Sequence, residues 1–452
     1  MGFFFKLAIA AVAVLSVVRA GEFIPPNDTK GVTKDGYIVV MKKGTSDRDF
    51  DTHRTWAAKI QSSTNKIRSG KQFSGPQNIT FHIGSLMGYS GVFDLEVAKK
   101  IAESRDVLYV QPNHRLSHPY IQKRRPRDQD TGKPISRTLR QAPTPDSWAV
   151  QPFAPSWGLR RISHRQSGSK ELIYQKSAGE GIMIYHFDTG VDISHPEFEN
   201  RATWGFNSVD DKNYDNDGHG THVAGTVIGK TLGIAKKAKL VAIRITGRIT
   251  IIDNSTLPID VNWKPSGDKD EDDFYIESSF FQALTWALQH ARQHQTLEKA
   301  IMLIEVQGPK SRVLDQAISE MAGAGFFVVI PAGNVPDADA STFSPQGADG
   351  ACLIGASASN DTAASWSSLG PKVDLYAPGV DIPSARAGGG TTFMSGTSFA
   401  APHAAGVAAC LMSAEKIAPL KVCDRLKELA LPSIKNPPPN TTNKLLYNGS
   451  GA

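Results

Sequence analysis

The sequence contains little cysteine and, beyond its N-terminus, no long apolar segment. Three cysteines, Cys352, Cys410 and Cys423, allow one disulfide with one thiol left over, and their spacing is not that of a metal site. After the first 20 residues no run approaches the roughly 20 apolar residues that a membrane-spanning helix needs. These absences argue against a cysteine-ligated metal protein and against an integral membrane protein.

The N-terminus is strongly apolar. The run from Leu7 to Val18 is followed by Val18-Arg19-Ala20, with small residues at the two positions that a signal peptidase reads. A membrane anchor is the alternative, but the run is short for a bilayer. We therefore expect a signal peptide over residues 1–20 and a secreted, extracellular, soluble product. Six sequons fit this route as glycosylation sites: Asn27, Asn78, Asn254, Asn360, Asn440 and Asn448.

The net charge of +6 is unevenly distributed. Between Pro119 and Ala149, seven Lys or Arg residues face three Asp residues in a stretch rich in Pro, Gln, Thr and Ser. This composition predicts a solvated basic linker over residues 119–149. The stretch lacks interleaved aromatic residues, so we expect no binding to nucleic acid. The linker separates a small module, residues 21–118, from a large one, residues 150–452.

The two modules differ in their hydrophobic patterns. In the first, Gly36 to Lys43 and Asp106 to Asn113 are typical of strands, and Asp94 to Ser104 is typical of an amphipathic helix, which predicts a small α+β unit. In the second, short apolar runs alternate with helical patterns: GIMIYHFDTG, HVAGTVIG, KLVAIRI, SSFFQALTWALQHARQ, AIMLIEVQG, VLDQAISEMAGAG and FFVVIPAGN. Such alternation predicts an α/β fold with a central parallel sheet, whose active site lies at the carboxyl ends of the strands.

Four polar residues occupy strand ends or helix starts in the large module. Asp188 and Asn334 each follow a predicted strand, His219 begins a helical run, and Ser398 precedes an Ala-rich helix. On its own stretch, SGTSFAAPHAAG, Ser398 is typical of a helix N-cap. A nucleophilic serine needs a base, a group that orients the base, and donors for the oxyanion. The other three residues are of the types that supply these functions.

The segments around these residues resemble a known family. YHFDTGVDISHPEF, DGHGTHVAGT, PAGN and SGTSFAAPHAAG resemble the four signature segments of subtilisin-like serine proteases. PSWGLRRIS, GIAKKAKL and NKLLYNGSGA resemble more narrowly the proteinase K branch, in particular secreted alkaline proteases of filamentous fungi. GYIVVMKK and DVLYVQPNHRL resemble strands of the inhibitory propeptide of the same family. The resemblance implies a subtilisin-like three-layer fold preceded by an inhibitor domain.

The resemblance assigns a role to each of the four residues. It makes Ser398 the nucleophile, His219 the general base and then acid, Asp188 the group that fixes the imidazole tautomer, and Asn334 an oxyanion donor. A serine at a helix N-terminus also has a free amide and a favourable helix dipole for the developing charge. The implied reaction is hydrolysis of peptide bonds without a catalytic cofactor.

The resemblance has further implications. It implies a disulfide between Cys352 and Cys423, a free thiol at Cys410, and structural calcium at Asp374. It also implies a zymogen whose own propeptide inhibits it, with protein or peptide substrates. We expect a monomer that does not bind membrane once the signal is removed.

Four other classes of protein were compared with the sequence, and three of them lack a residue or motif that the class requires. FDTG at 187–190 matches the aspartic-protease signature, but that class needs two such carboxylates, and the second DTG, at Asp130, lies in the linker. His219 and His222 could bind zinc, but the zincin glutamate motif is absent. An α/β-hydrolase needs its histidine after the serine, and only His403 follows Ser398. A subtilisin-like binding protein with weak or lost activity is the remaining alternative.

Two segments depart from the family pattern. Where relatives carry Ser-Leu-Gly-Gly on the strand that pairs with bound peptide, this chain has Glu305, Val306, Gln307 and Gly308. We expect these four residues to bind substrate, with Glu305 giving the cleft an anionic wall and Gln307 narrowing a pocket. The loop over residues 248–277 is about two dozen residues longer than in those relatives, and its acidic residues are expected either to reach outer subsites or to form a solvated surface excursion.

Overall fold

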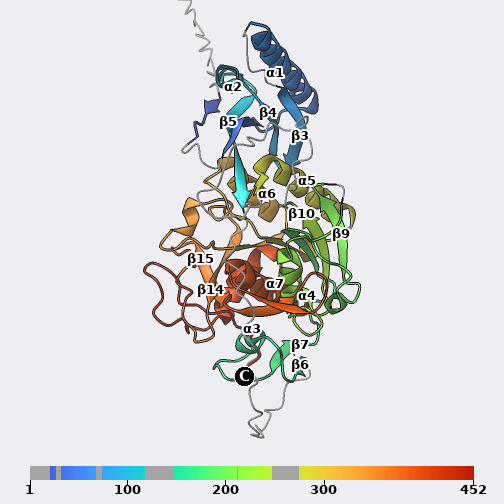
Figure 1. Ribbon diagram of the computed structural model, residues 1–452, viewed down its shortest axis with the longest axis vertical. Helices are drawn as coiled ribbons and strands as arrows, with labels where there is room; N and C mark the ends of the chain where they lie inside the picture. Colours follow the sequence, from blue (N-terminus) through green and yellow to red (C-terminus); the bar gives the residue numbers. More distant parts are fainter. Residues whose placement is uncertain (1–20, 27–31, 68–73, 118–146, 211, 247–273) are drawn as a thin grey trace, which may run out of the picture.

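The computed structural model describes residues 21–26, 32–67, 74–117, 147–210, 212–246 and 274–452 (Figure 1). The expected signal peptide, Asp130, and the acidic residues at 268–273 therefore lie outside the described residues. In the described ranges, no helix has both the length and the apolar character to cross a membrane.

The N-terminal unit is an α+β domain, as predicted, and lies at one end of the molecule (Figure 1). Its sheet has the order β1-β5-β2-β4-β3. Helices α1 and α2 pack on one face of this sheet. The elements are β1 (Glu22–Phe23), β2 (Val32–Met41), α1 (Asp47–Ile67), β3 (Gly75–Ile83), β4 (Leu86–Val92), α2 (Leu95–Ala102) and β5 (Val107–Ser117).

The large unit is built on a seven-stranded parallel sheet of order β15-β14-β13-β12-β8-β10-β9. Almost every residue of the central strands is buried, because helices cover both faces. The strands are β8 (Met183–Asp188), β9 (Ala202–Asn207), β10 (Lys239–Arg244), β12 (Ala300–Ile304), β13 (Phe327–Pro331), β14 (Ala351–Ser357) and β15 (Val373–Pro378). Two further antiparallel sheets have two strands each and lie outside it: β6 (Trp148–Gln151) with β7 (Leu172–Gln175), and β16 (Ile382–Ala385) with β17 (Thr391–Met394).

Helices form the outer layers of the predicted α/β fold. Side chains of α4 and α7 share one core with one face of the sheet, and side chains of α5 and α6 share another with the opposite face. The helices are α3 (Trp157–Arg161), α4 (His219–Ile228), α5 (Glu277–Gln293), α6 (Arg312–Gly323), α7 (Thr397–Glu415) and α8 (Val422–Leu429). Short 3₁₀ helices span Pro196–Phe198, Leu297–Lys299, Ala340–Thr342 and Pro419–Lys421. The predicted three-layer architecture is confirmed.

The N-terminal domain packs against the outer surface of α5 and α6 (Figure 1). The side chains of Ile38, Tyr109 and Leu116 belong to the same buried cluster as residues of these two helices. The rings of Phe81 and Phe281 lie 4.7 Å apart across the interface. The two domains therefore share a continuous apolar contact.

The structure adds elements that the hydrophobic pattern did not predict. Helix α1 was missed because polar His53 and Gln61 occupy buried positions of its inner face, which interrupts the apolar periodicity. Strand β5 continues four residues beyond the predicted Asn113, to Ser117. Strand β6 begins at Trp148, inside the last part of the predicted linker.

Candidate active site

Asp188 and His219 lie in direct contact where β8 ends and α4 begins. The His219 Nδ1 atom lies 2.9 Å from Asp188 Oδ1 and 3.0 Å from Oδ2, and both side chains are buried. An imidazole whose Nδ1–H donates to a carboxylate carries its basic lone pair on Nε2. The contact therefore selects the tautomer that a general base requires.

The electrostatics of the pair favour charge on both groups. Burial opposes ionisation of Asp188, but the charge of His219 and hydrogen bonds from His186 and His219 hold the pKa of its carboxyl well below its ordinary value. Burial alone would lower the pKa of His219, but Asp188 outweighs it and raises that pKa to about 9. The imidazolium that forms during proton transfer is thus stabilised by a fixed carboxylate.

His186 is a member of the site that sequence reasoning missed. Its Nε2 atom lies 3.0 Å from Asp188 Oδ2, and the backbone N–H of Thr189 donates to Oδ1 at 2.6 Å. Residues two apart on a strand face the same side, so a histidine in the apolar run IMIYHFD was a usable signal. His186 and Thr189 hold the carboxylate in the orientation that meets His219.

Ser398 is the second residue of α7 and is not its cap. The N-cap is Gly396, which makes no side-chain capping bond. The N-cap interpretation of the isolated stretch is therefore wrong. Ser398 lies in the first turn of a 19-residue helix, at the positive end of the helix dipole.

Asn334 is oriented by Thr397, a second residue that the sequence analysis did not single out. Its Oδ1 atom accepts from both the backbone N–H and the hydroxyl of Thr397, each at 2.9 Å. This fixes the amide so that Nδ2 lies against Gly396, at the start of α7. Asn334 thus presents a donor beside the N-terminus of the helix that carries Ser398.

The end of the N-terminal domain lies along the predicted substrate-binding strand. Ser117 and Gln307 exchange two backbone hydrogen bonds of 2.8 Å, in an antiparallel bridge. The last three residues of β5, 115–117, are called the tail here. On its other side the tail pairs antiparallel with β11 (Phe274–Ile276). The Leu116 side chain lies over Gly308, so that a β-carbon at position 308 would clash with it. The tail therefore adds as a strand between two edges of the large domain.

The four residues at 305–308 differ in their environments. The Val306 carbonyl accepts from Gln346, and the backbone groups of Gln307 bind the tail. A β-carbon at Gly333 would lie 2.8 Å from Nε2 and 3.0 Å from Oε1 of Gln307, so this amide lies directly over Gly333. Gln307 thus fills space between the strand at 305–308 and the segment before Asn334.

Glu305 is not exposed in this arrangement, in which the end of the N-terminal domain covers the neighbouring strand. Its side chain is fully buried. Burial, aided by the charge of Asp188, raises its pKa well above the ordinary value, so the carboxyl favours its neutral form. The expected attraction of cationic substrates by Glu305 stays a prediction.

His222, the second histidine of the zinc alternative, contacts residues of two other elements. Its Nε2–H donates to the Ile382 carbonyl at 2.9 Å, and its ring meets that of Phe399. Burial lowers its pKa to about 3. The ring is a neutral structural element behind the Asp188–His219 pair.

Comparison with known proteins identifies the family of this chain. The chain matches the Subtilase family over residues 179–445 and the Peptidase inhibitor I9 family over residues 36–118. Subtilisin-like protease 5 of Trichophyton tonsurans is 41% identical over 449 residues, and a subtilisin-like protease of Coccidioides posadasii is 39% identical over 449 residues, each match covering 99% of both chains.

Solved structures give the same result. A cold-adapted subtilisin-like serine proteinase is 33% identical, with a TM-score of 0.55 over 65% of this chain and 97% of its own. Fervidolysin from Fervidobacterium pennivorans is 19% identical, with a TM-score of 0.68 over 96% of this chain and 62% of its own, a likeness of fold alone. The protein is a serine endopeptidase with an N-terminal inhibitor domain. It belongs to the subtilase family.

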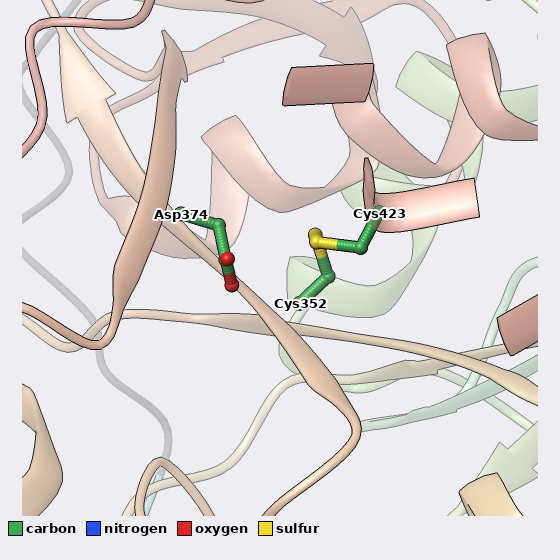
Figure 2. A group of neighbouring side chains, drawn as sticks. All are labelled: Cys352, Asp374 and Cys423. Carbon is green, nitrogen blue, oxygen red and sulfur yellow. A yellow bond between two sulfur atoms is a disulfide. The ribbon is translucent and has the colours of Figure 1, made fainter. Parts of the chain in front are cut away.

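The disulfide expected from the resemblance is present between Cys352 and Cys423, and Cys410 is a buried free thiol. Figure 2 shows Asp374 beside this disulfide. Asp374 accepts from the Leu353 N–H at 3.0 Å and lies 3.2 Å from Lys427 Nζ. Calcium takes several oxygen ligands, and an ammonium group with two disulfide sulfurs does not fit that requirement. Calcium at Asp374 stays a prediction that this arrangement does not support.

Loss of the disulfide is expected to destabilise the large domain. The bond closes a sequence separation of 71 residues. Removing such a bond costs about 2–5 kcal/mol, chiefly by releasing the unfolded chain. We expect Cys423→Ser to lower the midpoint of thermal unfolding by several degrees at a fixed scan rate, at about 2–4 °C per kcal/mol. Cys410→Ala is the control, with a smaller decrease from lost packing; equal decreases in the two variants would contradict the prediction.

Proposed function

We propose that the protein is a secreted serine endopeptidase made as a self-inhibited zymogen, with Asp188, His219 and Ser398 as its catalytic triad. The observation that carries this proposal is the bond from His219 Nδ1 to Asp188 beside the N-terminus of α7. The chain order of these residues is that of the subtilisin arrangement. Secretion rests on the apolar N-terminal segment at residues 1–20.

The mechanism follows from these positions. Ser398 Oγ attacks the carbonyl carbon of the peptide bond while His219 Nε2 takes its proton. The resulting oxyanion is stabilised by the backbone N–H of Ser398 and by the Asn334 amide. His219 then gives the proton to the leaving amine, the C–N bond breaks, and an acyl-enzyme remains. Water, deprotonated by the same imidazole, releases the acid and restores Ser398.

Self-inhibition follows from the strand formed by the N-terminal domain. The tail at Arg115, Leu116 and Ser117 occupies the edge on which an extended peptide would bind. We propose residues 21–118 as the inhibitor, 119–149 as the linker, and 150–452 as the peptidase, with excision between Ser117 and Ser156. The large domain has many non-local contacts, so a folding template attached to its N-terminus would aid its formation.

Labelling with a fluorophosphonate tests this proposal. The reagent phosphonylates a serine that has an active base, and mapping of the labelled peptide identifies the residue. We expect label on Ser398 in protein secreted from cells, and N-terminal sequencing should find a chain that starts between Ser117 and Ser156. Absence of label from the folded, processed protein would oppose the peptidase function.

A non-catalytic binding protein is the second candidate. One observation favours it: the Gln307 amide fills space over Gly333, beside the segment that carries Asn334. Such a protein would retain peptide in the cleft without cutting it. Peptide binding without labelling or hydrolysis would support this candidate.

Gln307 is expected to restrict the size of the substrate residue beside the scissile bond. Because its amide lies over Gly333, a large aromatic side chain cannot occupy the same space. We expect Gln307→Gly to raise kcat/KM for peptides with Phe at that position, relative to Ala, by about 10-fold or more. A peptide series that differs only at this residue measures the ratio.

Gln295→Gly is a matched control for this substitution. Gln295 is exposed, and its φ of 54° suits glycine, so the change should leave the ratio unaltered. An unchanged Phe-to-Ala ratio in Gln307→Gly would show that Gln307 does not limit the pocket.

A further inference from the structure

Two histidines lie one turn apart at the C-terminal end of α5. The backbone N–H of His294 donates to the His290 carbonyl at 3.0 Å, so the helical turn between them is closed. Side chains four residues apart on a helix lie on the same face. The ring centroids of this pair are 4.2 Å apart, with an angle of 37° between the ring planes. His290 is half-buried and His294 is exposed, so the pair can be reached from solvent.

A chain of hydrogen bonds fixes the tautomer of His290. The Ala291 carbonyl can only accept, so the Thr296 hydroxyl donates to it at 3.4 Å. The Thr296 oxygen then accepts from the Tyr185 hydroxyl at 3.2 Å, and the Tyr185 oxygen accepts from the Nδ1–H of His290 at 2.9 Å. An imidazole that carries its hydrogen on Nδ1 has its lone pair on Nε2. His290 therefore presents Nε2 as a basic nitrogen.

The surroundings of His290 suit a metal ligand. The indole of Trp286, one turn earlier on α5, stacks on the imidazole at 4.7 Å between ring centroids and 28° between planes. A metal ion binds in the plane of an imidazole, so a stacked ring restrains the ligand without covering its nitrogen. Burial, with the charge of His294, lowers the pKa of His290, and the neutral form is the one that binds metal.

The spacing of the pair fits one shared ion. An ion held at about 2.1 Å by each of two imidazole nitrogens bridges at most about 4.2 Å between them. The two ring centroids have this separation, and the exposed His294 side chain can turn to bring its nitrogen to the same ion. Two histidines four residues apart on a helix are also the arrangement by which helical zinc motifs bind their ion. A cation here would lie at the negative end of the α5 dipole.

We propose that His290 and His294 form a surface site for one divalent transition-metal ion of the Cu²⁺, Ni²⁺ and Zn²⁺ group, with Tyr185 orienting His290 and water completing the coordination. Imidazole suits these ions, whereas Ca²⁺ and Mg²⁺ take oxygen ligands. The ion bridges the last turn of α5 and stabilises the folded chain, because it binds the folded state in preference to the unfolded one.

This site is separate from the proposed triad. Tyr185 and His186 are successive residues of β8, and successive side chains of a strand point to opposite faces of the sheet. Tyr185 belongs to the core that contains α5, whereas His186 contacts Asp188. The metal site therefore lies on the face of the sheet away from α4 and α7, and the inference does not depend on the proposed catalytic residues.

The test is titration of the secreted protein with Cu²⁺, which binds most tightly among these ions, followed by calorimetry and tryptophan fluorescence. Bound Cu²⁺ quenches a nearby indole, so binding beside Trp286 should lower the emission. His290→Gln and His294→Gln should each weaken this binding by at least about 10-fold, and Tyr185→Phe, which keeps the ring but removes the acceptor, by about 10-fold. Trp286→Phe should keep the heat of binding and lose most of the quenching.

Arg292→Gln is the matched control. Arg292 is exposed in the same turn but lies two positions from each histidine, off their face of the helix, so this variant should keep the parental affinity. Excess Zn²⁺ should restore the emission by displacing Cu²⁺, and Ca²⁺ should not. Zn²⁺ should also raise the midpoint of thermal unfolding of the parent protein and leave that of His294→Gln unchanged.

The variants separate this site from other places where copper could bind. Equal Cu²⁺ affinity and quenching in the parent protein and in both histidine variants would overturn the site. Displacement by Ca²⁺ as effective as that by Zn²⁺ would overturn the class of metal. An unaltered affinity in Tyr185→Phe would overturn the role of Tyr185. Because His294 is exposed, its substitution should leave the fold intact, so misfolding of His290→Gln alone does not decide the result.

Discussion

Replacing Ser398 by alanine is expected to abolish peptide hydrolysis and to leave the N-terminal domain attached. Without the hydroxyl no acyl-enzyme forms, and the proposed triad acts as a unit. In subtilisin the loss of its serine costs about 2 × 10⁶ in kcat. Hydrolysis of a peptide substrate measures the first effect, and electrophoresis with N-terminal sequencing measures the second. The variant should still fold, because alanine is well tolerated at the second position of α7.

Ser395→Ala is the control for this result. Ser395 lies three residues earlier, outside α7, and its hydroxyl contacts Asp381. We expect near-parental hydrolysis and normal processing in this variant. Normal hydrolysis by Ser398→Ala would refute the serine mechanism. Normal processing of a hydrolytically dead variant would show instead that another protease removes the N-terminal domain.

Asp188→Asn is expected to lower kcat by about 10⁴, the loss found for the same change in another serine-protease triad. The carboxylate accepts the Nδ1–H of His219, whereas an amide can present a donor and favour the wrong tautomer. The pH dependence should change as well. Asp188 raises the pKa of His219 to about 9, so activity of the parent should rise with pH as the imidazole loses its proton. In Asp188→Asn that limb should move to lower pH.

The profile of kcat/KM between pH 5 and 10 measures this shift. Asp217→Asn is the control, because Asp217 accepts from the backbone N–H of His219 and not from its ring, and asparagine keeps an acceptor there. We expect a small change in the control. If the rising limb of Asp188→Asn stayed at the parental pH, the charge of Asp188 would not be what sets the pKa of His219.

Sequence patterns were informative wherever burial repeats with a regular period. The strands that became β8, β12 and β13 were predicted from short apolar runs, and Asp188 and Asn334 were placed at their carboxyl ends. Helix α1 escaped because polar side chains occupy part of its buried face. The Cys352–Cys423 bond came from the family resemblance, since three cysteines alone permit several pairings.

Glu305 shows most clearly where sequence reasoning reached its limit. Aligned by its distance from Asn334, it was expected on the wall of the cleft as a negative charge. A one-residue change of register or face decides whether a strand residue meets solvent or core, and no local pattern encodes that choice for a single glutamate after an apolar run. Thr397 was missed for a similar reason, because its partner Asn334 lies several elements earlier in the chain. His186 lies two residues before Asp188 on the same strand, and its signal was overlooked.

The sequence by itself determined the order of strands and helices, the residue types available for catalysis, and their chain order of Asp, His and Ser. Only the tertiary structure decided which of these side chains meet. The parallel pairing of β8 with β12 places Glu305 next to the end of β8, and α7, which carries Ser398, packs on the same face of the sheet as α4, which carries His219. Reactivity depends on such contacts because charge interactions and hydrogen bonds act over a few ångströms. The residues concerned lie far apart along the chain: Asp188 and Ser398 are separated by 210 positions.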